Sequence, residues 1–214
     1  LTPADQGVCI VGSRDADDDA LRVADYVARA AVEAGLTVVS GLAAGIDTAA
    51  HSAALDAGGR TVAVMGTGLE RTYPATNKNL RERIVANRGL VMTQFEPNAP
   101  VKPANFPMRN AVMSGYGITT FVVTASEHSG TRSQTKNAVK HGRGIVLARR
   151  VAETTSWGRD LARTGQARVG TVHNLTLASS AFELDFFGRV KAMSDQALNK
   201  YLATREARDA AELS

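Results

Sequence analysis

Four glycine-rich turns that also carry hydroxyl groups are the parts of this sequence best suited to chemistry, namely the binding of an anion. Glycine lets a ligand approach the backbone amides, and serine and threonine hydroxyls add hydrogen-bond donors. One such turn is a weak indication, because glycine is a common turn residue, but several together predict an anionic ligand. The turns are Gly12-Ser13-Arg14, Ser40-Gly41-Leu42-Ala43-Ala44-Gly45, Gly66-Thr67-Gly68 and Ser129-Gly130-Thr131.

The best-known nucleotide-binding signatures are absent from these turns. Gly12-Ser13-Arg14-Asp15 does not continue into Gly-x-Gly-x-x-Gly, and Gly-x-x-x-x-Gly-Lys-[Ser/Thr] occurs nowhere in the sequence. A dinucleotide-dependent dehydrogenase and a P-loop NTPase are therefore disfavoured. The single cysteine, Cys9, excludes an internal disulfide and a cysteine-based zinc cluster. We expect no metal and no cofactor.

The elements that must position the turns alternate between strands and helices. Strands are predicted at residues 7–12, 36–40, 61–65, 90–93, 119–123 and 144–148. Helices are predicted from the Asp17–Asp19 cluster to Gly35, and at 46–57, 78–87, 109–114 and 134–141, with a proline-rich loop at 96–107. This pattern predicts an α/β fold with a mostly parallel, doubly wound sheet and helices on both faces. All four turns then lie at the carboxyl ends of strands, where such sheets bind ligands.

The pattern weakens after Arg150. A helix at 157–163 and an edge strand at 169–173 are expected there. Further on, an apolar stripe of helical spacing is formed by Val190, Met193, Ala197, Leu198 and Tyr201. We expect residues 1–188 to form one domain. Residues 189–214 are expected to form an amphipathic helix that either belongs to that domain or mediates self-association as a homodimer.

Composition predicts a folded, basic protein. The 214 residues are 44% hydrophobic and 21% charged, with a net charge of +4. Between residues 131 and 170 there are nine basic residues and two acidic ones, Glu153 and Asp160. No apolar run approaches the roughly 20 residues that cross a bilayer, and the first residues lack signal-peptide features, so the cytoplasm and no membrane are expected.

Five motifs, in order and with compatible spacing over roughly residues 7–150, resemble the DNA-processing protein A (DprA/Smf) family. The resemblance implies an extended Rossmann-like fold of the DprA/LOG type. It also implies binding of single-stranded DNA without catalysis, and help in loading a RecA-type recombinase. The motifs are Val11–Arg14, Val39–Asp47 with His51, Val64–Leu69 with Tyr73-Pro74 and Asn77, Asn105–Gly115, and Glu127–Thr131 with His141–Arg143.

Carried over by motif, the resemblance indicates the residues that bind the DNA strand. Arg14 and Arg109 are expected to contact phosphates, and Phe106 or Tyr73 to stack on a base. Two of the set have plainer interpretations as well, since Asp47 could cap a helix and Phe106 could plug the core. The candidates are Gly12, Ser13, Arg14, Ser40, Gly41, Gly45, Asp47, Gly66, Gly68, Phe106, Arg109, Asn110, Ser129, Gly130 and Thr131.

The sequence also departs from the family pattern. It leaves no room for the helical domain and winged helix that flank typical members, which predicts a compact, stand-alone member. The segment Arg132–Asn137 is polar where the family often has an apolar continuation.

Two alternatives stay open. A related nucleotide phosphoribohydrolase of the LOG type is disfavoured, because Gln134 stands where those enzymes carry a catalytic Glu. A LOG-related sensor that holds a nucleotide without cleaving it needs only one or two cations. The basic stretch after Thr131 favours a longer DNA strand.

Overall fold

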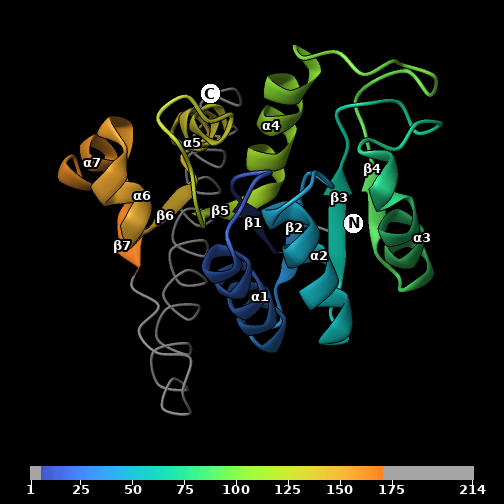
Figure 1. The fold of residues 1–214 in the computed structure, drawn as a ribbon, viewed down its shortest axis with the longest axis horizontal. Coiled ribbons are helices and arrows are strands. Elements are labelled where there is room, and N and C mark those ends of the chain that lie inside the picture. The colour runs from blue at the N-terminus through green and yellow to red at the C-terminus, as the bar shows by residue number, and fades with distance from the viewer. Residues whose placement is uncertain (1–5, 171–214) are drawn as a thin grey trace, which may run out of the picture. The chain divides into compact units, whose positions relative to one another are not determined.

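The computed structural model describes residues 6–170, which build one seven-stranded parallel sheet of order β4-β3-β2-β1-β5-β6-β7 (Figure 1). From β1 the chain moves outward to β4 and then returns to place β5 against the other side of β1. The sheet therefore has a topological switch point between β1 and β5. The strands are β1 (Gly7–Val11), β2 (Thr37–Ser40), β3 (Thr61–Val64), β4 (Leu90–Met92), β5 (Gly117–Val122), β6 (Gly144–Ala148) and β7 (Arg168–Gly170).

Helices cover the sheet as the alternating pattern predicts. Helices α1 and α2 pack against each other in front of the central strands in Figure 1, and α4 and α5 form a second packed pair. The α/β class, the parallel sheet and its doubly wound character are thus confirmed. The helices are α1 (Asp18–Glu33), α2 (Ile46–Asp56), the 3-10 turn η1 (Ala75–Asn77), α3 (Lys78–Ala86), α4 (Asn105–Tyr116), α5 (Thr131–Lys140), α6 (Arg149–Thr154) and α7 (Ser156–Arg163).

Local sequence explains the ends of α1. The Asp17 side chain accepts a hydrogen bond from the Ala20 amide at 2.9 Å, which satisfies one of the free donors of the first turn. Asp18 and Asp19 lie in that turn, where their charge complements the helix dipole. After the helix, Gly35 adopts a positive φ of 73°, which turns the chain into β2. The residues of β1, β2 and β3 are buried throughout, which explains their continuous apolar pattern.

The predicted helices differ from the structure by more than two residues at three places. Helix α5 begins at Thr131, three residues before its predicted start at 134. Helix α4 begins at Asn105, so the predicted loop at 96–107 ends early and the helix is longer than 109–114. Pro107 lies in its first turn, where a missing amide costs no intrahelical hydrogen bond. Helix α6 was not predicted at all. The predicted edge strand is β7, whereas the C-terminal helix at 189–214 and the domain boundary at 188 lie outside the described residues.

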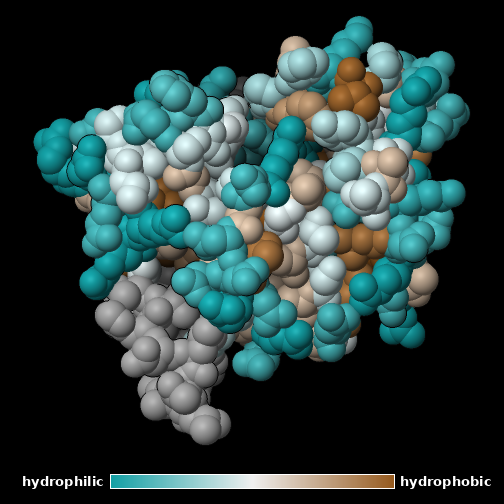
Figure 2. Space-filling view, in the orientation of Figure 1, coloured by the Kyte–Doolittle hydropathy of each residue, from teal (hydrophilic) through white to brown (hydrophobic). Residues whose placement is uncertain are grey.

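The surface on the face shown in Figure 2 is mostly hydrophilic, and its apolar residues form small separate patches. None of the helices between residues 6 and 170 is long and apolar enough to span a membrane.

Candidate nucleic-acid interface

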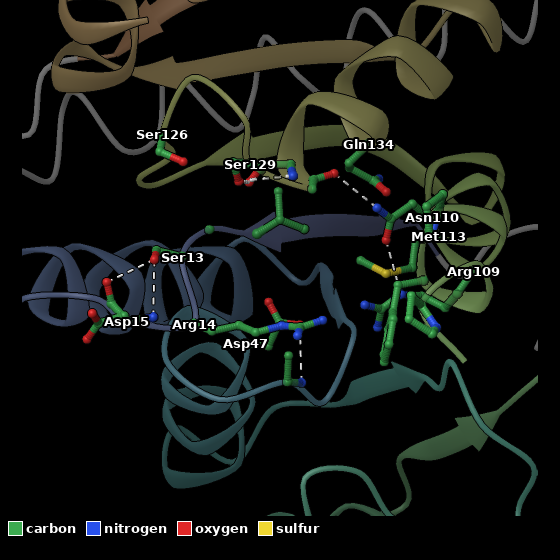
Figure 3. Close-up of a pocket in the computed structure, with 18 of the residues that line it drawn as sticks. Ser13, Arg14, Asp15, Asp47, Arg109, Asn110, Met113, Ser126, Ser129 and Gln134 are labelled. Atoms are coloured by element: carbon green, nitrogen blue, oxygen red, sulfur yellow. Dashed lines mark hydrogen bonds between the residues drawn. The ribbon is translucent and has the colours of Figure 1, made fainter. Parts of the chain in front are cut away.

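A cavity of about 680 Å³ lies beyond the carboxyl ends of β1 and β5, at the topological switch point (Figure 3). Its walls come from the turns after β1 and β2, from α4 and from the start of α5. The structure therefore gathers most of the predicted site. The candidate residues that line the cavity are Gly12, Ser13, Arg14, Asp47, Phe106, Arg109, Asn110, Ser129, Gly130 and Thr131.

Five other candidates do not line the cavity: Ser40, Gly41, Gly45, Gly66 and Gly68. The Ser40 hydroxyl donates to the Ile10 carbonyl at 2.6 Å and so joins two strands. A Cβ added at Gly41 would collide with the Arg109 guanidinium, and one added at Gly66 would lie 2.8 Å from the Phe106 ring. Packing of the protein's own side chains therefore already requires glycine at these two positions.

Arg109 is buried and bonded to the ends of two strands. It is 6% exposed, and its Nη1 donates to the carbonyls of Gly41 at 2.6 Å and Val64 at 2.8 Å. Its Nε donates to Asn110 Oδ1 at 3.1 Å. Burial lowers the pKa of the Arg109 guanidinium, and the carboxylate of Asp47 acts against that shift. Arg109 thus connects α4 to the ends of β2 and β3. Of its three guanidinium nitrogens, Nη2 makes no hydrogen bond to the described residues.

Asp47 holds the turn that precedes its own helix. Its Oδ2 accepts hydrogen bonds from the amides of Gly41 at 3.1 Å and Ala43 at 3.3 Å. The N-cap of α2 is Gly45, which makes no side-chain bond, so Asp47 is a turn acceptor rather than a helix cap. Burial raises the pKa of the Asp47 carboxyl, and the charge of Arg109 limits that rise. The amide of Gly41 is therefore occupied by the protein itself.

The turn after β1 is different, because its donors are free. No hydrogen bond within residues 6–170 uses the amides of Gly12, Ser13 or Arg14. Arg14 is exposed, and its guanidinium lies 4.8 Å from the centre of the Phe106 ring. The ring of Tyr73, 43% exposed, lies 5.9 Å from that of Phe106. An exposed cation, two aromatic rings and unbonded amides therefore meet at the mouth of the cavity.

The start of α5 provides the opposite wall. A Cβ added at Gly130 would meet nothing within 4 Å, so open space adjoins this glycine. The hydroxyls of Ser129 and Thr131 bond to each other, and the Gly130 carbonyl accepts from Asn110 Nδ2 at 3.3 Å. Of the predicted turns, those at 12–14 and 129–131 are the pair that face the cavity with room for a ligand.

Met113 and Gln134 also line the cavity and were not among the candidates. The sequence held a signal for Met113, which lies one helical turn after Arg109 in the predicted helix and so shares its face. Gln134 shares a face with Thr131 only because α5 begins at Thr131, before its predicted start.

The basic stretch after residue 131 lies mainly on other surfaces. Arg150 binds Asp17 at 2.5 Å, Arg159 donates to the Glu153 carbonyl at 2.9 Å, and Arg143 donates to the Gly115 carbonyl at 3.0 Å. Arg132 and Lys136 line a separate groove between α5 and α7. The basic side chains that line the main cavity are Arg14 and Arg109, beside the acidic Asp15 and Asp47. The basic stretch therefore does not line this cavity as the preference for a strand had assumed, and two cations there suit a single nucleotide as well as a strand.

Comparison with known proteins identifies the family. The family described as DNA recombination-mediator protein A matches residues 2–177. The chain belongs to this family. It is 40% identical over 139 residues to the protein Smf of Synechocystis, which covers 65% of this chain and 35% of that protein. It is 39% identical over 138 residues to DprA of Streptococcus pneumoniae, covering 64% of this chain and 48% of that protein. The chain therefore spans less than half the length of these relatives.

Solved structures agree with the fold. The crystal structure of S. pneumoniae DprA superposes with a TM-score of 0.67 at 31% identity, over 77% of this chain and 58% of that chain. A Helicobacter pylori DprA structure, described as showing a single-stranded DNA binding mode, gives 0.69 at 21% identity, over 92% and 81%. The molybdenum cofactor carrier protein of Chlamydomonas reinhardtii gives 0.54 at 16% identity, which shows a common fold alone.

Proposed function

We propose that this domain binds single-stranded DNA and acts in DNA processing without cleaving its ligand. The observation that carries the proposal is the exposed Arg14, which lies over Phe106 beside three unbonded amides at the mouth of the cavity. Backbone amides and an arginine together suit a phosphate, and aromatic rings suit a base. Family membership and the DNA-binding mode reported for the H. pylori protein support the same ligand class.

The two ends of the cavity suit different parts of a nucleotide. Phosphates fit the turn at 12–14, where the amides and Arg14 supply donors and charge. Bases fit the aromatic rim of Phe106 and Tyr73. The guanidinium of Arg14 already covers one face of Phe106, so a base that stacks there either lies on Arg14 or displaces it.

The exposure and hydrogen bonding of the carboxyl groups that line the cavity support the proposal that the domain is not an enzyme. Hydrolysis of a glycosidic bond normally uses a pair of carboxyl groups that flank the bond. The cavity is lined by Asp15, which is exposed, and by Asp47, whose Oδ2 is held by two amides. Gln134 carries an amide, which cannot serve as an acid or base. A binding role therefore fits these groups better than the LOG-type hydrolase does.

The proposal extends to delivery of the bound strand to a RecA-type recombinase, which the description of the family as a recombination mediator supports. The test is whether the chain accelerates the assembly of a recombinase filament on DNA coated with a single-strand-binding protein. The same acceleration with the binding-defective variant described next would contradict delivery of the strand.

The test of binding is a titration of labelled oligonucleotides, single and double stranded and of several lengths, at two salt concentrations. We expect affinity to rise with strand length. We expect Arg14→Ala to weaken binding about equally for all sequences and to lower the salt slope by about one. Arg83→Ala is the matched control, because that exposed arginine pairs with Asp56 on α2.

Three outcomes would contradict parts of the proposal. An unchanged salt slope would remove Arg14 as a phosphate contact. Saturation by a single nucleotide would favour the sensor, and release of a free base would favour the hydrolase.

A further inference from the structure

The floor of the cavity holds a hydrogen-bond acceptor with no donor. Gln134 projects from α5 above Asn110 and Met113 (Figure 3) and is 1% exposed. Its Nε2 donates to Thr120 Oγ1 at 3.3 Å, but its Oε1 is enclosed and accepts no hydrogen bond from the described residues. Buried polar atoms in folded proteins are almost always paired, so an unpaired one inside a binding cavity marks a position where a ligand donor fits.

The neighbouring polar groups are already used within the protein. Both ends of the Asn110 amide are bonded, Nδ2 to the Gly130 carbonyl and Oδ1 to Arg109 Nε. Arg109 Nη1 is held by two carbonyls. The oxygen of Gln134 is therefore an acceptor on the floor of the cavity to which a ligand could donate a hydrogen bond.

Gln134 Oε1 is a hydrogen-bond acceptor, so the part of a nucleotide that fits beside it must carry a donor. A phosphate diester offers only acceptors and negative charge, so it has no donor for the Gln134 oxygen. A nucleobase offers N–H donors on its edge and apolar faces. Val11 and Met113 supply apolar wall beside Gln134. A ligand site with apolar walls and a few polar groups is typical of base binding.

We propose that the floor of the cavity takes a nucleobase, whose edge N–H donates to Gln134 Oε1 while the sugar and phosphate stay at the rim. The inference rests on the proposed function and adds a base-recognising residue to it. Gln134 is thus a specificity residue and takes no part in bond breaking.

The test uses thymidine oligomers of about six nucleotides, within the usual site size for single-strand binding. Thymine has one hydrogen-bond donor, N3–H, and N3-methylation removes it. We expect the fully N3-methylated oligomer to bind the wild-type protein about tenfold more weakly, because the buried acceptor then stays unpaired.

Gln134→Leu separates the hydrogen bond from the added bulk of the methyl group, because leucine keeps much of the glutamine volume and removes the acceptor. We expect this variant to fold normally, to bind unmodified thymidine oligomers about tenfold more weakly than the wild type, and to bind both oligomers within about twofold of each other. Asn137→Ala on the same helix, which does not line the cavity, is the control and should discriminate as the wild type does.

Three results would overturn base recognition while leaving strand binding intact. The first two are equal wild-type affinity for both oligomers and unchanged affinity of Gln134→Leu for the unmodified one. Displacement by ribose 5-phosphate as effective as by thymidine monophosphate would also overturn it, because the sugar phosphate has no base. Failure of the wild type to bind either oligomer would instead remove the proposed function itself.

Discussion

Arg109 illustrates how a residue that the sequence indicates as a ligand contact also maintains the fold. The resemblance to the DprA/Smf family predicted a phosphate partner for its charge. The structure adds hydrogen bonds to the carbonyls of Gly41 and Val64, which lie 68 and 45 residues away in the sequence. Such partners could not be predicted, because nothing local to Arg109 specifies which strand ends α4 will meet.

We expect Arg109→Ala to lower the free energy of unfolding by about 3 kcal/mol, because it leaves two buried carbonyls and the Asp47 carboxylate without their cation. Urea denaturation followed by circular dichroism measures the change. Arg83→Ala, at an exposed pair, should stay within about 0.5 kcal/mol of the wild type. A fully stable Arg109→Ala that loses DNA binding would show that Arg109 acts mainly on the ligand.

At the scale of elements, the contact of α2 with β3 contains a buried histidine. His51 Nδ1 lies 2.7 Å from Thr61 Oγ1, and that hydroxyl donates to the Val38 carbonyl of β2. Burial, with a smaller effect of the charge of Arg109, lowers the pKa of His51 to about 3. The native state therefore holds the imidazole neutral at a pH where the unfolded chain would protonate it.

This arrangement predicts that acid weakens the fold. The unfolded imidazole takes up a proton near pH 6.5, and the native one only near pH 3, so stability is lost as the pH falls between these values. From pH 7 to pH 5 we expect His51 to account for a loss of about 2 kcal/mol. Urea denaturation at both pH values should show a smaller loss for His51→Gln. Equal losses in the two proteins would show that other groups carry the acid sensitivity.

Periodicity and turn residues predicted most elements, because the strands β1, β2 and β3 are buried throughout and glycines mark several of the turns between elements. The same reasoning failed at α4 and α6. Proline is tolerated in a first helical turn, so four prolines between residues 97 and 107 did not exclude a helix start. Helix α6 follows β6 without an intervening turn, and composition gives no boundary there.

At the scale of the whole molecule, Cys9 reports on global opening. It lies in the central strand β1 at 0% exposure, and its thiol donates to the Met113 carbonyl at 3.1 Å. Burial raises the pKa of Cys9 to about 12, so the reactive thiolate is scarce in the folded protein.

We expect a thiol reagent at pH 8 to label native protein slowly and unfolded protein in urea quickly. Because a ligand that binds only the native state stabilises it, single-stranded DNA at about 100 times its dissociation constant should slow labelling through global opening by about 100-fold. Double-stranded DNA of the same length is the control. Rapid labelling of the native protein would contradict the burial of Cys9.

The sequence predicted a binding site at the carboxyl edge of the sheet, because parallel strands bring their carboxyl ends together, and the cavity lies at that edge. Sequence reasoning did not predict which turns face a common cavity, because that depends on the order of the strands in the sheet. With β1 next to β5, the turns at 12–14 and 129–131 meet, and the turn at 66–68 is left aside.

Because the strand order reverses at β1, neither half of the chain forms the cavity by itself. Its two lips are encoded more than a hundred residues apart and become neighbours only when β5 docks beside β1. A nascent chain still lacking β5 would hold an incomplete receptor, so we expect capture of a DNA strand to await the end of synthesis of this domain.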